Sequence, residues 1–435
     1  YFEEFSRLDA QLRDGVVLVA DHTWPLISAR KKVDFLWDVK GYSFESHETQ
    51  QLSMHQLALK APLVYQEGKE PANTTSLEVI ERGYDFPYLP HLSMEPPNCV
   101  VKIENEICDV WVGTQRPKKL REHIAKILEM PLEKVIVHPL RMGGAFGRKA
   151  QTDFVVECAL IAKKMRRPVK LLWLREDDVQ FDFFRPASYQ KLRAEFKKTG
   201  EIIRWVHTCV MPMRESNVHD EKTILEPTQK DLQQGATDFL LNTQSMQFYA
   251  KGVASDVRIG IWRSVNHSFF AHAINCFIDD IAHVCQEHPL DYRLKHLKRS
   301  SISRRFQSVW RQEPSQTERM RLVLEKMKEE AKTLYSSASS SEDTQKSAVG
   351  FAAHHAFGAV IAIAVKITTE KKQVLIEQIH VVVDAGFIVN PIQALSQIEG
   401  GVYFALGAAL FGEILIEKGC VKNRNFHDTP ILPRY

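Results

Sequence analysis

The stretch Arg141-Met142-Gly143-Gly144-Ala145-Phe146-Gly147-Arg148-Lys149 places three glycines within five residues and follows them directly with two cations. It lies between an apolar segment, 135–138, that predicts a strand and a segment with helical spacing, 151–165. Glycine permits a positive φ and lets backbone N–H groups approach an anion without a Cβ in the way. A following helix adds N–H donors and the positive end of its dipole. The stretch therefore predicts a ligand-binding loop at the carboxyl end of a strand.

The spacing of this loop excludes two common nucleotide-binding motifs. Its pattern is G-G-x-x-G-x-K, whereas dinucleotide-binding loops carry G-x-G-x-x-G and P-loops carry G-x-x-x-x-G-K followed by Ser or Thr. A glycine pair here is also compatible with a plain tight turn between a strand and a helix. The identity of a ligand therefore has to come from the rest of the chain.

The composition is that of an ordinary globular protein with two or three hydrophobic cores. The chain has 435 residues, of which 44% are hydrophobic and 26% are charged. Its 57 cationic and 54 acidic side chains nearly balance, so we expect neither nucleic acid nor a membrane surface as the main partner. The longest apolar run, 402–412, is shorter than the ~20 residues of a membrane span, so no transmembrane segment is predicted. No secretory signal is visible, and we expect a cytoplasmic or periplasmic location.

The cysteines exclude one kind of redox centre. Seven are present, at positions 99, 108, 158, 209, 276, 285 and 420, and none forms a C-x-x-C pair. An odd, scattered set in a long chain is typical of buried thiols. Iron–sulfur clusters need cysteine ligands at characteristic spacings. We therefore expect any such cluster on a partner polypeptide and no iron bound to this one.

Two further groups of side chains raise the question of a metal site. Arg175-Glu176-Asp177-Asp178 gathers carboxylates, but no histidine or further acid completes a site, so a solvated turn is predicted. His354 and His355 are neighbours in a predicted strand, where adjacent side chains point to opposite faces and cannot easily share one ion. A zinc site is therefore not predicted.

Periodicity predicts a mixture of helices and strands. Strands are expected at 16–20, 35–39, 100–103, 107–112, 135–138, 169–174, 349–367 and 373–383. Helices are expected at 22–35, 117–128, 151–165, 268–286, 288–297, 316–334 and 391–410, with a final hairpin at 412–426. Residues 40–79 are predicted to be irregular, 211–243 to be a surface excursion, and the serine run 336–341 to be a flexible linker.

Motifs outside the glycine loop occur in an order that resembles a known family. Upstream lie Met94-Glu95-Pro96-Pro97-Asn98-Cys99 and Asp109-Val110-Trp111-Val112-Gly113-Thr114-Gln115. Downstream lie Gly260-Ile261-Trp262-Arg263-Ser264-Val265, Val383-Asp384-Ala385-Gly386, Val389-Asn390-Pro391 and Gln397-Ile398-Glu399-Gly400-Gly401. Together they resemble the molybdenum hydroxylases, the xanthine dehydrogenase and aldehyde oxidase family. The Trp-Arg-Ser-Val variant, and Arg148 where xanthine dehydrogenases carry glycine, are most similar to the beta subunit of isoquinoline 1-oxidoreductase-type enzymes and to bacterial aldehyde dehydrogenases.

The resemblance implies an α+β fold, in which mixed α/β molybdenum-cofactor-binding domains follow the end of a small α/β hammerhead domain. Residues 1–60 would form the C-terminal part of that small domain. Residues 61–335 would form the first cofactor-binding subdomain, and 336–435 a second, truncated one. The cofactor would be molybdopterin in its cytosine dinucleotide form, with the molybdenum held by the pterin and no direct protein ligand.

The same resemblance assigns residues to the cofactor. Gln115 would lie near the molybdenum oxo ligand, Arg263 on the other side of the metal, and Gln397 against the pterin. The loop beside the metal would comprise Gly143, Gly144, Ala145, Phe146 and Gly147, and a phosphate would meet Arg148 and Lys149. Each residue has a structural alternative: an amide bonded to backbone for Gln115, a core phenylalanine for Phe146, a surface salt bridge for Arg263, a plain amide on the helix surface for Gln397, and exposed cations at a helix start for Arg148 and Lys149. If the assignment holds, Gln115, Phe146, Arg263 and Gln397 line one cleft at the subdomain boundary.

Two parts of the family pattern are not found. The family's general base is a glutamate in a Gly-x-Gly-Glu-Pro-like segment, and neither Glu399 nor Glu413 matches it, so no catalytic residue is assigned. A Ser-Glu-Met-Gly-Gln-Gly-like cofactor segment is also missing. The sequence leaves open both a fragment and a subunit that needs a partner polypeptide.

The function implied by the resemblance is that of the molybdopterin-binding subunit of an oxidoreductase. Such an enzyme hydroxylates a carbon of an N-heterocyclic aromatic compound or an aldehyde with water-derived oxygen. The electrons would pass to an iron–sulfur small subunit, with a cytochrome as a candidate acceptor beyond it. Two alternatives stay open: a non-catalytic remnant that binds a cofactor or partner, and an unrelated α/β binding protein.

Overall fold

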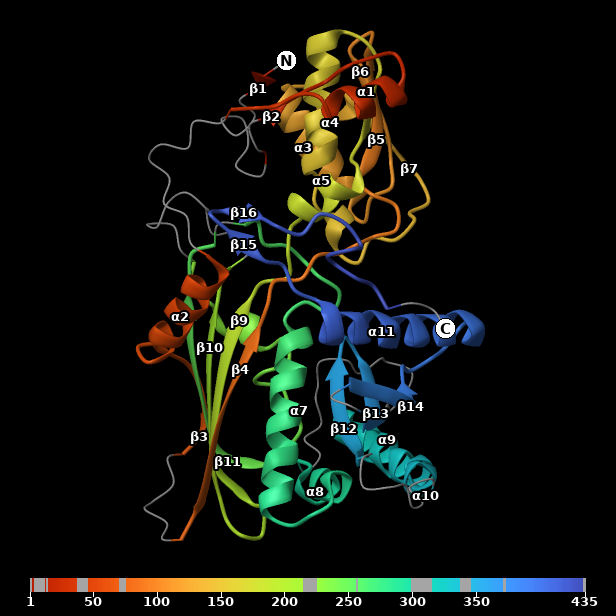
Figure 1. Cartoon of the computed structure of the whole chain (residues 1–435). Helices are drawn as coiled ribbons and strands as arrows, with labels where there is room; N and C mark the ends of the chain where they lie inside the picture. Colours follow the sequence, from red (N-terminus) through yellow and green to blue (C-terminus); the bar gives the residue numbers. More distant parts are fainter. Residues whose placement is uncertain are drawn as a thin grey trace.

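The computed structural model of the protein describes residues 2–3, 12, 15–36, 46–69, 76–213, 225–255, 257–298, 315–336, 346–370 and 373–432. A four-stranded sheet with its helices forms the upper part of the molecule in Figure 1, and a five-stranded and a three-stranded sheet form the lower part. The helix α11 (Pro391–Phe411) lies between the upper part and the three-stranded sheet in this view. The mixture of helices and sheets confirms the predicted α+β class.

The four-stranded sheet carries the glycine loop. Its order is β7 (Val135–Pro139), β6 (Ile107–Val112), β5 (Asn98–Glu104) and β8 (Val169–Leu172). Two helices, α3 (Pro117–Leu128) and α4 (Asp153–Met165), pack on it because each has an apolar stripe that becomes buried. In β6 the alternate residues Cys108, Val110 and Val112 are buried, as expected for a strand with one face in the core. All six elements agree with the prediction from periodicity.

The glycine loop leaves the sheet where two parallel strands end. β6 and β7 are parallel neighbours, with Val112 opposite Pro139. Gln115 follows β6 and residues 140–147 follow β7, so both lie at the same edge of the sheet. A short 3-10 turn, Arg148–Ala150, then leads into α4. The predicted place of the loop, at the carboxyl end of a strand, is confirmed.

The five-stranded sheet forms the largest core. Its order is β3 (Leu63–Gly68), β11 (Thr243–Gly252), β10 (Ile202–Met211), β9 (Ser188–Phe196) and β4 (Glu78–Phe86), and only β10 and β11 are parallel. The helices α2 (His47–Ala58) and α7 (His267–Val284) lie on opposite sides of it (Figure 1). Trp205 of β10 meets Phe277 of α7 edge-on, with ring centroids 5.2 Å apart, and both side chains are fully buried.

Most errors of the sequence prediction lie in this part of the chain. The stretch 40–79 is not irregular where it is described, because it contains α2, β3 and the start of β4. In the described part of 211–243, the side chains of Leu232, Phe239 and Leu241 are buried in the main core, so a surface excursion is wrong. Residues 175–178 are not a solvated turn but the start of α5 (Arg175–Gln180), in which Asp178 is buried.

The three-stranded sheet shares the core of the five-stranded one. It consists of β12 (Lys346–Ala356), β13 (Ala359–Glu370) and β14 (Gln373–Asp384), all antiparallel. Its Phe351, Val360 and Ala362 pack in the same hydrophobic cluster as α7 and α9 (Gln316–Glu330). The predicted single strand 349–367 is two strands, which turn at Phe357 and Gly358 in left-handed conformations. The core therefore continues across position 336, and the serine run lies outside the described residues except for Ser336, which ends α10 (Lys332–Ser336).

The N-terminal prediction is correct only for its helix. α1 (Thr23–Arg30) lies within the predicted 22–35. The strand expected at 16–20 is reduced to β2 (Gly15–Val16), which pairs with β1 (Phe2–Glu3). Of the strand expected at 35–39, only residues 35 and 36 are described, and they are not in a strand.

The helix α11 is apolar and fully at the surface. It begins after Asn390, whose side chain accepts a hydrogen bond from the backbone N–H of Gln393, and its single charged residue is Glu399. None of its residues is buried. By length and composition α11 could cross a membrane, but a helix that packs against protein passes the same test, so no span is established. The predicted hairpin follows as β15 (Ile416–Glu417) and β16 (Cys420–Val421).

Candidate functional site

The predicted site residues come from three segments that meet beside the four-stranded sheet. The glycine loop, residues 140–147, is the first, and Gln115 lies next to it. The second is the arginine loop, residues 260–265, which precedes α7 and carries Arg263. The third is α11, which carries Gln397.

Specific contacts join these segments. The Gln115 side-chain oxygen accepts a hydrogen bond from the Gly147 N–H at 3.2 Å. The Phe146 ring lies 4.6 Å from the Phe404 ring of α11. The Arg263 guanidinium carbon lies 6.0 Å from the centre of the Phe146 ring and 5.7 Å from that of Phe404. Segments distant in sequence are therefore neighbours here, as the resemblance requires.

Gln397 joins this group through its backbone. The Nη2 of Arg263 donates a hydrogen bond to the Gln397 carbonyl oxygen at 3.3 Å, and the Gln397 side chain itself is exposed. The amide is thus left available on the surface of α11. Gly401, one turn further on, allows the guanidinium to approach, because a Cβ there would lie 3.3 Å from Arg263 Nη2.

Several groups at this junction lack either a hydrogen-bond acceptor or a counter-ion in the described part of the chain. Arg263 makes no ion pair with a described carboxylate, and burial lowers the pKa of its guanidinium. The backbone N–H groups of Gly144, Ala145 and Phe146 likewise donate to no described residue. The Gln115 Nε2 also donates to no described residue, since only the side-chain oxygen of Gln115 is hydrogen-bonded. Unpaired N–H groups of successive loop residues beside a cation form a site for an anion or for oxygen acceptors.

Arg148 and Lys149 do not belong to this group of free donors. The guanidinium of Arg148 is fully buried, bonds both oxygens of Asp153 at 2.8 Å and pairs with Asp182 at 3.0 Å. Lys149 is buried too and pairs with Glu95. This corrects the expectation that both cations meet a cofactor phosphate, because protein carboxylates take their place. The alternative of exposed helix-start cations is also wrong.

The glycines of the loop are needed for different reasons. A Cβ on Gly147, where φ is +116°, would lie 1.6 Å from the carbonyl oxygen of Ile261, so this glycine lets the arginine loop touch the glycine loop. A Cβ on Gly143 would lie 2.6 Å from Glu95 Cβ. Gly144, with φ +95°, has no such close protein neighbour, its nearest atom being 3.4 Å away on the Phe146 ring. Among the three glycines, only Gly144 therefore leaves room for a ligand.

Both loops hold non-glycine residues in left-handed conformations. Phe146 has φ 52°, and in the arginine loop Ser264 has φ 69° and Val265 φ 52°. Such conformations cost on the order of 1–3 kcal/mol each, most for a β-branched residue such as valine, and they persist only where the surroundings impose them. They cluster at functional sites, which supports the assignment of this junction.

Glu95 is a residue of the site region for which no role was predicted. Its carboxylate accepts a hydrogen bond from the Gly143 N–H at 2.9 Å and also pairs with Lys149, so it ties both ends of the glycine loop. Burial opposes its ionisation, but Lys149 and the Gly143 N–H keep the pKa of Glu95 below its usual range. The position of Glu95 in the Met-Glu-Pro motif could have indicated a role for it, but the motif does not indicate which groups the carboxylate binds.

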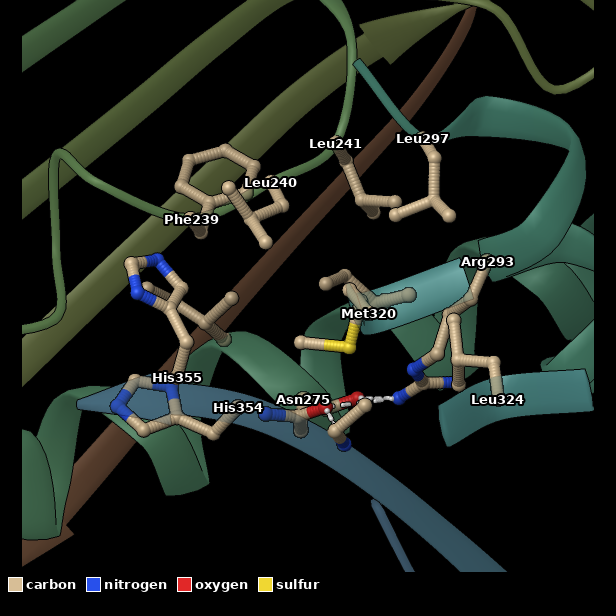
Figure 2. Close-up of a pocket in the computed structure, with 13 residues that line it drawn as sticks. Phe239, Leu240, Leu241, Asn275, Arg293, Leu297, Met320, Leu324, His354 and His355 are labelled. Carbon is tan, nitrogen blue, oxygen red and sulfur yellow. Dashed lines mark hydrogen bonds between the residues drawn. The ribbon is translucent and has the colours of Figure 1, made fainter. Parts of the chain in front are cut away.

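A cavity of about 40 Å³ lies elsewhere, between α7, α8 (Pro289–His296), α9 and β12 (Figure 2). Apolar side chains of Phe239, Leu241 and Met320 line it together with His354 and His355. It holds one or two waters at most, whereas a cofactor needs several hundred cubic ångströms. His354 bonds His267 at 2.9 Å and His355 bonds the Asp238 carbonyl, so both act as structural histidines. Among the described residues no cluster of three His, Cys, Asp or Glu side chains could hold a metal ion.

The chain matches two family models. The first, Molybdopterin cofactor-binding domain, covers residues 55–297, which is more than half of the chain, and a second of the same description covers residues 281–433. Two overlapping matches thus span both loops and α11.

Known proteins similar to the chain agree with these matches. It is 25% identical over 84% of its length to the Membrane-bound aldehyde dehydrogenase [pyrroloquinoline-quinone] of Gluconacetobacter polyoxogenes, covering 48% of that protein. It is 24% identical over 82% of its length to the Isoquinoline 1-oxidoreductase subunit beta of Brevundimonas diminuta, covering 43% of that protein. The chain thus spans less than half the length of either relative.

The fold is also similar to a solved structure. Quinoline 2-oxidoreductase from Pseudomonas putida 86 superposes with a TM-score of 0.68 at 12% identity, over 85% of this chain and 70% of that one. At this identity the likeness concerns the fold alone. The family models decide the classification, and on their evidence, which the relatives support, the chain belongs to the molybdenum hydroxylase family, whose molybdopterin cofactor-binding domains it matches.

Proposed function

We propose that the chain forms the molybdopterin-binding part of a molybdenum-dependent oxidoreductase. The observation that carries this proposal is the set of free donors at the junction of the two loops and α11. They comprise the Arg263 guanidinium, the Gln115 amide and the N–H groups of Gly144, Ala145 and Phe146. A polar, anionic, oxygen-rich cofactor fits donors of this kind. The relatives are named as a dehydrogenase and as a subunit of an oxidoreductase, which does not favour a non-catalytic remnant.

Each segment has a stated role in the proposal. Gln115 Nε2 and the loop amides donate to the cofactor from one side, and Arg263 supplies positive charge from the other. The exposed Gln397 amide donates from α11, next to Gly400, where nothing lies within 4 Å of a Cβ position. The bound cofactor supplies the redox chemistry, in which a substrate carbon gains water-derived oxygen and gives up two electrons.

The walls of the junction support a proposal for the substrate class. Phe146 and Trp262 both pack against Phe404, at 4.6 and 4.7 Å between ring centroids. Aromatic walls with few polar groups suit a flat N-heterocycle or an aromatic aldehyde. We propose an iron–sulfur partner subunit for electron removal, with a cytochrome as further acceptor, and a cytoplasmic or periplasmic location.

The form of the cofactor is a separate proposal. A cytosine dinucleotide form needs cations for its phosphates, and Arg148 and Lys149 are engaged with carboxylates. Two exposed arginines beside the site, Arg116 and Arg141, are the cations that we assign to this role. The general base is not assigned to any residue of this chain.

The experiment uses the full-length protein that carries this chain, produced with its partner subunit in a host that makes molybdopterin. Molybdenum and oxidised pterin are measured per polypeptide for the natural protein, for Arg263→Met and for Arg82→Met. Arg82 is the matched control, because it is an exposed arginine paired with Asp280 on the far sheet.

We expect near-stoichiometric molybdenum and pterin in the natural protein and in Arg82→Met, with a loss of at least about tenfold in Arg263→Met, as for removal of a charge-assisted contact. Bound pyrroloquinoline quinone in place of pterin would refute the proposal. Equal occupancy in all three proteins would remove Arg263 from the site.

A further inference from the structure

His91 occupies an unusual place between the two loops. It is completely buried, in the segment that joins β4 to β5. Its Nδ1 lies 2.9 Å from the Asp182 carboxylate, and its Nε2 lies 2.8 Å from the Ile261 carbonyl oxygen in the arginine loop. The His91 backbone N–H donates to the same carboxylate at 2.7 Å.

The partners of the imidazole determine its protonation. A carboxylate and a carbonyl oxygen can only accept hydrogen bonds, so both ring nitrogens must donate. Both can donate only when the ring is an imidazolium. The buried carboxylate of Asp182 provides the opposite charge next to it. Burial opposes ionisation of Asp182, yet the charges of His91 and Arg148 lower the pKa of this carboxyl group.

The carbonyl that His91 holds is the one that touches the glycine loop. The Ile261 oxygen lies 1.6 Å, and the His91 Nε2 3.1 Å, from the position that a Gly147 Cβ would occupy. The imidazolium therefore fixes the point where the arginine loop passes the glycine loop. The absence of a side chain on Gly147 makes this contact sterically feasible.

Neighbouring hydrogen bonds complete a clamp on the arginine loop. Trp262 Nε1 donates to the Pro90 carbonyl at 3.1 Å, in the opposite direction to the bond from His91. At the start of the loop, Gly260 N–H donates to the Phe184 carbonyl at 3.0 Å. Both ends of the segment 260–262 are thus held by residues within two positions of His91 or of Asp182.

Arg263 depends on this clamp for its position. No described carboxylate holds its guanidinium, whose hydrogen bond is to the Gln397 carbonyl. Ser264 and Val265, which follow it, are in left-handed conformations that the local sequence does not favour. The position from which the Arg263 side chain reaches α11 and the Phe146 ring therefore depends on the backbone at Ile261 and Trp262.

We propose that His91, as an imidazolium held by Asp182, is a positioning residue that fixes the Ile261 carbonyl against Gly147 and so directs Arg263 towards the cofactor. The inference rests on the proposed function for its last step only. The clamp itself consists of contacts within this chain, and it holds the glycine loop and the arginine loop in register.

The test compares His91→Gln with His207→Gln in the full-length protein. His207 is the matched control, since it is also a fully buried, hydrogen-bonded histidine but lies in the five-stranded sheet. Hydrogen–deuterium exchange of residues 260–266 and 142–147 is measured on cofactor-free protein. Molybdenum retention and the unfolding temperature are measured on the holoprotein.

We expect His91→Gln to exchange roughly tenfold or more faster in both loops, as for loss of a charge-assisted hydrogen bond, and to retain less molybdenum. His207→Gln lowers the unfolding temperature and leaves loop exchange unchanged. Natural exchange rates in the loops of His91→Gln would overturn the proposal. If wild-type protein binds no molybdenum, the proposed function fails, while the exchange result still decides the clamp.

Two further measurements cover the case in which His91→Gln does not fold. Trp262→Phe keeps the stacked ring and removes the bond to Pro90, so faster exchange confined to 260–266 supports the clamp and an unchanged rate contradicts it. The ¹⁵N spectrum of histidine-labelled natural protein shows two protonated nitrogens for the His91 ring if it is an imidazolium. A neutral ring contradicts the proposal.

Discussion

At the scale of single residues, the partners of an arginine indicate whether its charge is balanced within the protein or is available to a ligand. Arg148 has the buried carboxylates of Asp153 and Asp182 within 3.0 Å, so its charge is neutralised inside the protein. Arg263 has aromatic rings and a carbonyl as neighbours, and no described carboxylate. A half-buried cation without a counter-ion is costly unless a ligand completes its environment. This contrast, rather than the number of cations near the loop, is why we propose Arg263 as the arginine that contacts the cofactor.

The first prediction concerns Gly147. In Gly147→Ala the new Cβ meets the Ile261 carbonyl at a position 1.6 Å away and at φ +116°, so the loops must move apart. We expect a loss of about 1–3 kcal/mol in the free energy of unfolding and a large fall in molybdenum content. Gly350→Ala is the matched control, because nothing lies within 4 Å of its Cβ position. Urea unfolding and metal analysis check both, and equal behaviour of the two variants contradicts the contact.

Short sequence motifs made some site residues predictable, whereas the roles of other residues could not be predicted from them. Gln115, Phe146 and Arg263 lie inside motifs whose order identifies the family, so their convergence could be expected before the fold was known. The burial of Arg148 could not be predicted in this way, because its partner Asp182 lies outside the motif. The role of His91 is hidden for the same reason, since its two partners belong to segments far away in sequence.

At the scale of elements, local periodicity succeeded where one face of a helix or strand is buried. α3 and α7 were predictable because their apolar stripes face a core. β10 was not, because its residues are buried on both faces near its end, from 207 to 211, and the alternation disappears. The left-handed turn at Phe357 and Gly358 was also missed, since phenylalanine rarely adopts such a conformation and gives no turn signal.

The second prediction concerns a histidine inside the five-stranded sheet. His207 of β10 is buried and its Nε2 donates to Gln190 of β9 at 2.8 Å, and burial lowers its pKa to about 3. The His207 side chain therefore binds a proton near pH 6.5 in the unfolded chain, whereas in the folded protein it stays neutral at that pH. Stability is full above pH 6.5 and falls as the pH drops towards 3, by up to ~1.4 kcal/mol per pH unit for this group.

The measurement is urea unfolding of the natural chain and of His207→Asn between pH 7.5 and 5. The variant is less stable at pH 7.5 but loses stability less steeply below pH 6.5, because one uptake site in the unfolded state is removed. His22→Asn is the control for replacing a histidine by asparagine, because His22 is exposed and lies outside the five-stranded sheet. An identical slope for His207→Asn and the natural chain contradicts a neutral, buried His207.

At the scale of the whole molecule, α11 links the parts that form the site. Its Phe404 packs against Phe146 of the glycine loop and Trp262 of the arginine loop. Directly after the C-terminal end of α11, a Leu89 side-chain atom lies 2.5 Å from the position that a Gly412 Cβ would occupy, and the Ile414 N–H donates to the Tyr88 carbonyl at 3.1 Å. Yet no residue of α11 is buried, so few contacts hold a helix on which the proposed site depends.

The third prediction tests that dependence. Phe404→Ala removes the ring that both loops share, so we expect α11 to open more often and to exchange its amide hydrogens faster by roughly tenfold, as for loss of an aromatic contact worth ~1–1.5 kcal/mol. Tyr403→Ala, its exposed neighbour on the same helix, is the matched control and should change exchange little. The loops 142–147 and 260–266 should also exchange faster in Phe404→Ala, because their rings lose the same partner. If only α11 loosens while both loops keep their natural rates, the loops are held by His91 and Glu95 alone, and α11 contributes donors to the site without organising it.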